Sequence, residues 1–132
     1  MNNIDFYKKV MSVQKEGMNA AVATIIRTKG STPRSIGAKM IILADGDIYG
    51  TIGGGCGEGE VIEKSFAVME RGIPSQHRVD LTEGLMYEDG GICGGIMDVF
   101  IEPIHPARTR KENKKSYGEY NLYKNRYQKI QT

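Results

Sequence analysis

Apolar positions in the first part of the chain follow two periods, and each period predicts its own kind of element. In residues 4–17, apolar side chains recur every three or four positions, which is typical of an amphipathic helix that ends at Gly17. Residues 20–26 form a continuous apolar run with β-branched side chains, which predicts a buried strand. Residues 38–43 have the same character and predict a second strand.

A tight turn is predicted between this second strand and the segment after it. Asp45-Gly46 is a strong hairpin signal, so residues 38–43 are expected to pair antiparallel with residues 47–52. The third strand then leads directly into a glycine-rich run over residues 50–60. Behind the glycines, apolar residues at helical spacing predict a helix over residues 57–71, which Gly72-Ile73-Pro74 ends.

Two further strands complete the predicted sheet. Residues 77–81 alternate and predict an edge strand, and residues 96–103 predict a last strand closed by Pro103. Residues 27–37 are rich in Gly, Ser and Pro and predict a loop. The expected fold is a single α+β domain over residues 1–105, with a mainly antiparallel or mixed sheet, flanking helices and a strand–glycine loop–helix unit.

Charge is divided unevenly along the 132 residues. Residues 1–105 contain 10 basic and 14 acidic side chains, whereas residues 106–132 contain 8 basic and 2 acidic ones. The acidic first part argues against a nucleic-acid-binding core, and no apolar run approaches the roughly 20 residues of a membrane span. No signal-peptide pattern follows Met1, so we expect a cytoplasmic protein whose two cysteines are free thiols.

The basic tail over residues 106–132 is also rich in tyrosine. Its charge favours a solvated segment. An alternative is a short helix docked on this chain or on a neighbouring copy, because several apolar side chains share one helical face. These are Tyr120, Tyr123, Tyr127 and Ile130.

The glycine-rich run is the first candidate for chemistry. Gly53, Gly54 and Gly55 let the backbone approach a ligand, and a helix N-terminus favours anions such as phosphates. Cys56 lies where the helix begins, so its thiol is expected to have a lowered pKa and to act as a nucleophile or metal ligand. The alternative is purely architectural, because such turns are common and a buried cysteine is often a small apolar side chain. Glu58 also disfavours a strongly negative ligand.

Two more loops are expected at the same end of the sheet. One carries Arg27 and Arg34, and the other carries Cys93 and Gly94 within residues 90–95. Arginines, free backbone N–H groups and a thiolate together favour an anionic, phosphate-bearing ligand with a soft centre.

Other uses of the cysteines have less support in the sequence. A zinc site built from Cys56, Cys93, His77 and His105 lacks short ligand spacing. A redox pair of the two cysteines lacks a C-x-x-C motif. A Cys56–His77 hydrolase pair has no third group to orient it.

Three ordered segments resemble the N-terminal domain of the XdhC/CoxI family. They are residues 24–40, which contain Lys-Gly-Ser-Thr-Pro-Arg, residues 50–58 around Gly-Gly-Gly-Cys, and residues 92–103, which begin Ile-Cys-Gly-Gly and end Glu-Pro. These proteins are accessory factors for molybdenum hydroxylases such as xanthine dehydrogenase and carbon monoxide dehydrogenase. Two departures stand out: Gly57 replaces a bulkier residue, and the usual C-terminal Rossmann-like domain has no counterpart in these 132 residues.

The resemblance implies a chaperone rather than a turnover enzyme, which binds the molybdenum cofactor transiently, aids its sulfuration and inserts it into an apo molybdenum hydroxylase. A cysteine desulfurase or a separate Rossmann-like chain would be further partners, and we expect a homo-oligomer without nucleic-acid or membrane partners. The alternatives are a small phosphate-ligand or nucleotide-binding regulatory module, and a sulfur-transfer protein with a persulfide on Cys56. The residues expected to bind the cofactor are Arg34, Gly53, Gly54, Gly55, Cys56, Cys93 and Gly94, with Cys56 as the metal ligand.

Overall fold

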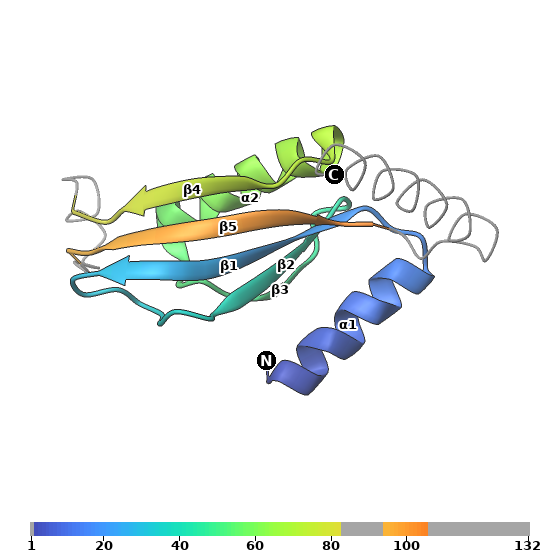
Figure 1. The fold of residues 1–132 in the computed structure, drawn as a ribbon, viewed down its shortest axis with the longest axis horizontal. Helices are drawn as coiled ribbons and strands as arrows, with labels where there is room; N and C mark the ends of the chain where they lie inside the picture. Colours follow the sequence, from blue (N-terminus) through green and yellow to red (C-terminus); the bar gives the residue numbers. More distant parts are fainter. Residues whose placement is uncertain (1, 83–93, 106–132) are drawn as a thin grey trace, which may run out of the picture.

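The computed structural model describes residues 2–82 and 94–105, so the predicted tail over residues 106–132 lies outside it. A five-stranded antiparallel sheet with strand order β3-β2-β1-β5-β4 forms its centre (Figure 1). The elements in chain order are α1 (Asn3–Lys15), β1 (Ala20–Lys29), β2 (Lys39–Leu43), β3 (Ile48–Gly50), α2 (Gly55–Arg71), β4 (Ser75–Asp80) and β5 (Ile96–Ile104). The predicted α+β class is confirmed.

The two helices cover opposite faces of the sheet (Figure 1). Alternation along β1 divides its side chains between them. Ala21, Ala23 and Ile25 belong to the core under α2, whereas Ala20 and Val22 belong to the smaller core under α1. A central strand covered on both faces must be apolar at nearly every position, which explains the unbroken run in the sequence.

Local interactions set the start of α1 and the ends of both helices. The Oδ1 atom of Asn2 accepts a hydrogen bond from the backbone N–H of Asp5 (2.8 Å), which caps α1. Gly17 follows α1 with φ 71°, as predicted. Gly72 follows α2 with φ 68° and donates its N–H to the Val68 carbonyl (2.8 Å), which satisfies an end-of-helix acceptor.

The predicted hairpin is confirmed, with a shorter second strand. Ile41 pairs with Tyr49, so β2 and β3 are antiparallel around the Asp45-Gly46 turn. β3 ends at Gly50, not at residue 52, because Gly50 has φ 81° and its backbone lies against the Lys39 carbonyl. A Cβ at Gly50 would lie only 2.5 Å from that oxygen.

Two predicted strand boundaries are wrong. β1 continues to Lys29, although residues 27–29 were expected in a loop, because residues 27–29 pair with β5 beyond a register shift between Ile25 and Arg27. β5 runs past Pro103 to Ile104. Proline is tolerated there because the β4 pairing ends at Ile101, which leaves β5 with one open side beyond it.

The edge strand predicted over residues 77–81 is β4, which lies at the margin of the sheet. Neither helix of the described residues has the length and hydropathy needed to cross a membrane.

Candidate functional site

Three loops meet at the end of the sheet where β1 and β3 finish and β5 begins, which we call the loop end. The loop after β1 lies between the other two. Pro33 contacts the backbone of Gly53, where a Cβ would lie 2.9 Å from the proline Cβ and overlap its ring. On the other side, a Cβ at Gly95 would lie 2.7 Å from the Lys29 carbonyl oxygen and clash with that of Ser31. The expectation that these loops gather is confirmed as far as residue 94, and Cys93 lies outside the described residues.

Residues 51–54, which we call the glycine loop, are held by hydrogen bonds to Glu58 in the first turn of α2. Its Oε2 atom accepts hydrogen bonds from the Thr51 hydroxyl (2.7 Å), the Gly54 N–H (2.8 Å) and the Ile52 N–H (3.3 Å). The Gly53 N–H donates to the Thr51 hydroxyl oxygen (3.0 Å). A carboxylate of the chain therefore already lies against the backbone donors of residues 52 and 54, where the sequence suggested a ligand phosphate.

The helix after the loop begins at Gly55, two residues earlier than predicted, so Cys56 is its second residue. No side chain caps this helix end. The first N–H groups of a helix lack internal acceptors and lie at the positive end of its dipole, so the backbone position of Cys56 is the one predicted. The thiol itself lies outside the described part, and its lowered pKa stays a prediction.

Gly57 has a packing explanation. A Cβ at this position would lie 2.7 Å from the Val79 Cγ1 atom and 3.5 Å from the Leu81 Cδ2 atom. The first turn of α2 therefore lies close against β4 and its end. This contact accounts for glycine at a position where the resemblance implied a bulkier residue.

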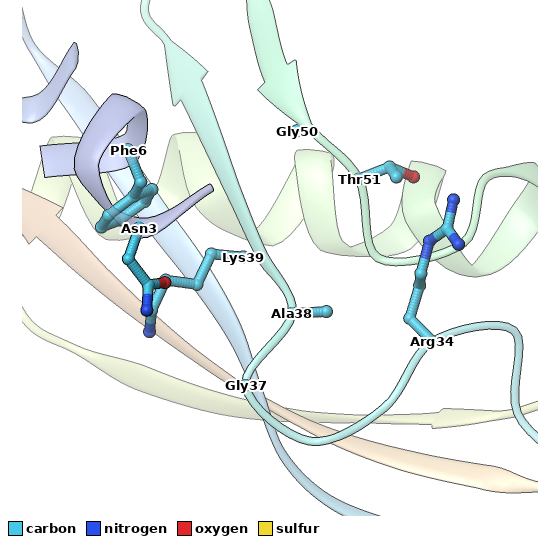
Figure 2. Close-up of a pocket in the computed structure, with 8 residues that line it drawn as sticks. All are labelled: Asn3, Phe6, Arg34, Gly37, Ala38, Lys39, Gly50 and Thr51. Atoms are coloured by element: carbon cyan, nitrogen blue, oxygen red, sulfur yellow. The ribbon is translucent and has the colours of Figure 1, made fainter. Parts of the chain in front are cut away.

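A pocket of about 380 Å³ connects the glycine loop with the start of α1. Figure 2 shows Arg34 reaching from its loop toward the glycine loop, where Thr51 lies. Lys39 lines the same pocket from β2, and its ammonium group lies 3.3 Å from the Thr24 hydroxyl. The full lining is Asn3, Phe6, Arg34, Gly37, Ala38, Lys39, Gly50 and Thr51.

The sequence did not single out Lys39, Asn3 or Phe6 as site residues. Lys39 follows a loop and opens a strand, which is an ordinary place for a solvated lysine. Its place in the pocket becomes visible only when α1 is placed over the sheet, because that packing makes the position part of a pocket wall.

The sequence grouped Arg27 with Arg34 in one loop that would bind an anion, but Arg27 does not line the pocket. It lies within β1, and its Nη1 atom donates to the Asp98 carboxylate (3.3 Å). Arg78 of β4 binds the same carboxylate through Nε (2.9 Å) and Nη2 (3.3 Å). Asp98 is buried, so this cross-strand triad compensates a charge that would otherwise be costly.

The triad predicts how stability depends on pH. The hydrogen bond from Arg78 is the largest cause that holds the pKa of Asp98 below its ordinary value of 3.8. Such a group stabilises the fold fully above its unfolded pKa, and the contribution is lost as pH falls toward the folded pKa. Asp98→Asn should therefore flatten the fall in melting temperature between about pH 5 and pH 3.

Thermal melts of both proteins across this range measure the effect. The pKa of Asp80 is also lowered, chiefly by the Thr82 hydroxyl, and this contribution persists in both proteins. Equal slopes for wild type and Asp98→Asn would contradict the role given to the triad.

The histidines do not assemble a metal site among the described residues. His77 contacts Glu60 across the surface (Nε2 to Oε2, 3.0 Å). His105 follows the far end of β5, roughly 25 Å from the loop end at the usual rise per strand residue. Within residues 2–82 and 94–105, no group of three or more His, Cys, Asp or Glu side chains could hold a metal ion.

Comparison with known proteins gives one family. Residues 13–80, which include α1 from Val13, the first four strands and the whole of α2, match the XdhC and CoxI family. The glycine loop and Arg34 both lie inside the matched segment.

Several known proteins are similar in sequence to this chain. The chain is 35% identical over 107 residues to the uncharacterized protein YqeB of Escherichia coli, and 27% identical over 112 residues to a probable xanthine dehydrogenase subunit from Bacillus subtilis. It is also 27% identical over 109 residues to the molybdenum cofactor insertion chaperone PaoD of Escherichia coli. These matches cover 77–83% of the chain but only 19–34% of the relatives.

A solved structure has the same fold. It is described as a xanthine dehydrogenase from Bacillus halodurans, and it superimposes with a TM-score of 0.67 at 29% identity. The match covers 79% of this chain and 31% of the other. The chain thus corresponds to about a third or less of each of these four proteins.

Proposed function

Because this chain belongs to the XdhC and CoxI family, we propose that it binds the molybdenum cofactor transiently and helps to insert it into a xanthine dehydrogenase-type molybdenum hydroxylase. The family match carries the proposal, and PaoD, a relative named as a molybdenum cofactor insertion chaperone, supports it. The domain acts as an accessory factor and not as a turnover enzyme.

The residues at the loop end suit the chemistry of this cofactor. Molybdopterin carries a phosphate, for which Arg34 in the pocket is a suitable partner. The cofactor supplies molybdenum held by dithiolene sulfur, a soft centre that a thiolate can bind. Cys56 is the second residue of α2, next to the glycine loop, and would serve as that ligand, with Gly53, Gly54 and Gly55 allowing close backbone approach. Cys93 and Gly94 would complete the site from the third loop.

The finer parts of the proposal concern sulfur and partners. Help with cofactor sulfuration would require a sulfur donor such as a cysteine desulfurase, with Cys56 carrying the sulfur as a persulfide. The apo hydroxylase is the partner that receives the cofactor, in the cytoplasm. A Rossmann-like chain would be a further partner, and we expect the chain to work as a homo-oligomer.

Cofactor content and delivery test the function directly. The protein would be purified from a host that makes molybdenum cofactor, analysed for molybdenum and pterin, and then mixed with an apo hydroxylase. We expect both components to copurify and hydroxylase activity to appear. Protein free of pterin and molybdenum that also fails to activate the hydroxylase would reject the proposal.

Cys56 should be the more reactive of the two thiols. A helix N-terminus stabilises thiolate, so its kinetic pKa should fall below the ordinary value of about 8.5. Alkylation rates measured against pH in Cys93→Ala report Cys56, and those in Cys56→Ala report Cys93. A kinetic pKa for Cys56 at or above about 8.5 would contradict an activated thiolate.

A small phosphate-ligand module is the second candidate. The pocket lined by Arg34 and Lys39 favours this function, because none of its lining side chains is a metal ligand. Binding of a simple phosphate ester without retention of molybdenum cofactor would distinguish this function from the first.

A further inference from the structure

Apolar side chains continue round α1 beyond the face that packs on the sheet. Ile4, Tyr7 and Met11 are 67%, 60% and 67% exposed, whereas Phe6 and Val13 of the same helix are buried. At about 100° per residue the three exposed side chains form one stripe along the helix, turned away from Val13. No other labelled element lies against this outer side of α1 (Figure 1). A continuous exposed apolar stripe of this kind indicates an interaction surface.

A groove of about 280 Å³ runs beside this stripe, between α1 and the end of β5. Tyr7 belongs to both features, and its ring meets the Phe6 ring edge-on, with the ring centroids 5.3 Å apart. The stripe and the groove therefore form one surface, which we call the α1 surface. Its apolar groove residues are Tyr7 and Val10 from α1, and Val22, Pro103 and Ile104 from the sheet.

The chain leaves the described fold at the rim of this groove. His105, the last described residue, is part of the groove lining, so residues 106–132 begin there. A connection over residues 106–119 can extend to roughly 45 Å, which is longer than the whole of α1. The C-terminal segment can thus reach every part of the α1 surface.

The apolar positions of this segment match those of α1 in spacing. Ile4, Tyr7, Met11 and Gln14 follow one another at intervals of three, four and three residues, and the predicted face of Tyr120, Tyr123, Tyr127 and Ile130 repeats these intervals. A helix over residues 120–130 would be about 17 Å long, close to the roughly 15 Å from Ile4 to Gln14. Two helices with such faces can pack along their common length.

Charge favours the same occupant. Glu102 supplies the one carboxylate of the groove lining, and it forms no salt bridge within residues 2–82 and 94–105. Residues 120–130 contain three basic and no acidic side chains. Lys124 and Arg126 lie on the two flanks of the predicted apolar face, so either one can approach Glu102.

We propose that residues 120–130 form an amphipathic helix that packs on the α1 surface of their own chain. The apolar face would cover Tyr7 and Met11, with a basic flank at Glu102. A segment joined by a short connection has a millimolar effective concentration, which favours the chain's own tail over that of a second copy. The inference goes beyond the proposed function and does not depend on cofactor binding.

Peroxide oxidation of Met11 measures this covering directly, because an exposed thioether is oxidised faster than a covered one. In the full chain, combined Tyr123→Ser and Tyr127→Ser should speed Met11 oxidation about five- to tenfold, as expected when a linked helix that is bound most of the time is released. Met69 on α2 is an internal reference whose rate should not change. Mass spectrometry of the two methionine peptides gives the rates.

Leu122→Ser is the matched control in the tail, because residue 122 lies opposite the predicted apolar face and an apolar side chain is again lost. Its Met11 rate should stay within about twofold of wild type. On the receiving surface, Tyr7→Ser should speed Met11 oxidation, whereas Ile73→Ser, at an exposed apolar position after α2, should not. Thermal melts verify that each variant is folded. Equal Met11 rates in wild type and the double tyrosine variant would overturn the proposal.

Carbodiimide cross-linking of Glu102 to Lys124 identifies the chain that supplies the helix. In an equal mixture of isotopically light and heavy protein, both halves of each cross-linked peptide should carry the same label. Pairs of mixed label would place the tail on a second copy and overturn the proposal. Protection of Met11 that disappears on dilution would do the same, since packing within one chain does not depend on protein concentration.

Discussion

Replacing Gly53 with alanine is expected to destabilise the protein by about 2–5 kcal/mol, the sum of a strained backbone and an overpacked contact. Gly53 has φ 131°, a region that side chains with a Cβ rarely adopt. The new methyl group would also overlap the Pro33 ring from the neighbouring loop. Chemical denaturation of wild type and variant measures the loss.

Two other glycines provide matched controls. Gly54 has φ 77°, but a Cβ there would meet no atom within 4 Å, so Gly54→Ala should cost only the backbone strain of about 1–3 kcal/mol. Gly59 lies inside α2 and is also unobstructed, so Gly59→Ala should stabilise by about 0.5–1 kcal/mol.

The Pro33 contact can be tested separately. Pro33→Ala removes the ring atoms and should recover part of the loss in a Gly53→Ala background, because the two residues touch. Equal costs for Gly53→Ala and Gly54→Ala, together with no coupling to Pro33, would show that the loops do not depend on this contact.

Arg34→Ala is expected to weaken binding of the molybdenum cofactor by about 1.5–3 kcal/mol, or roughly 10- to 150-fold, the range for hydrogen bonds to a charged group. Arg34 lines the pocket in which the ligand phosphate is proposed to lie. Titration of the cofactor into wild type and variant, at one fixed ionic strength, gives the difference.

Cys56→Ala should act on the other end of the same ligand. Its loss would appear at the metal or sulfur, with phosphate contacts intact, so the losses in the double variant should be close to additive. Cofactor binding that is unchanged in Arg34→Ala would remove the phosphate from this pocket. Strong non-additivity would mean that the two residues do not contact separate ends.

Local signals in the sequence were sufficient where the chain itself sets the geometry. Asp45-Gly46 defined the hairpin, and Gly72 defined the end of α2, because turn residues and left-handed glycines act within a few positions. The meeting of the loop after β1 with the glycine loop also followed, since antiparallel strands place alternate connections at one end of a sheet.

Non-local packing explains what the sequence missed. The extension of β1 to Lys29 depends on the partner strand β5, about 70 residues later in the chain. On α2, helical spacing grouped Ile62, Phe66 and Met69, yet the buried side chains are Val61, Ser65 and Val68, and Phe66 is 40% exposed. The exact rotation of a helix is set by the sheet beneath it.

The candidate site shows the same division. Arg34 and the glycine loop could be named from composition and order. Lys39 could not be named in this way, because the pocket that it lines together with Phe6 and Thr51 forms only when α1 packs over the sheet. Glu58 was recognised as a negative charge near the loop, but its hydrogen bonds to that loop required the folded turn.

The hydrogen bonds between Glu58 and the glycine loop affect how quickly a ligand dissociates. A loop whose backbone donors are already satisfied keeps its shape in the free protein, and it gains little when a ligand arrives. Binding then depends on a few side chains at the pocket, and dissociation requires no refolding of the loop. For a protein proposed to pass its ligand to another enzyme, Glu58 would limit residence time and favour release over storage.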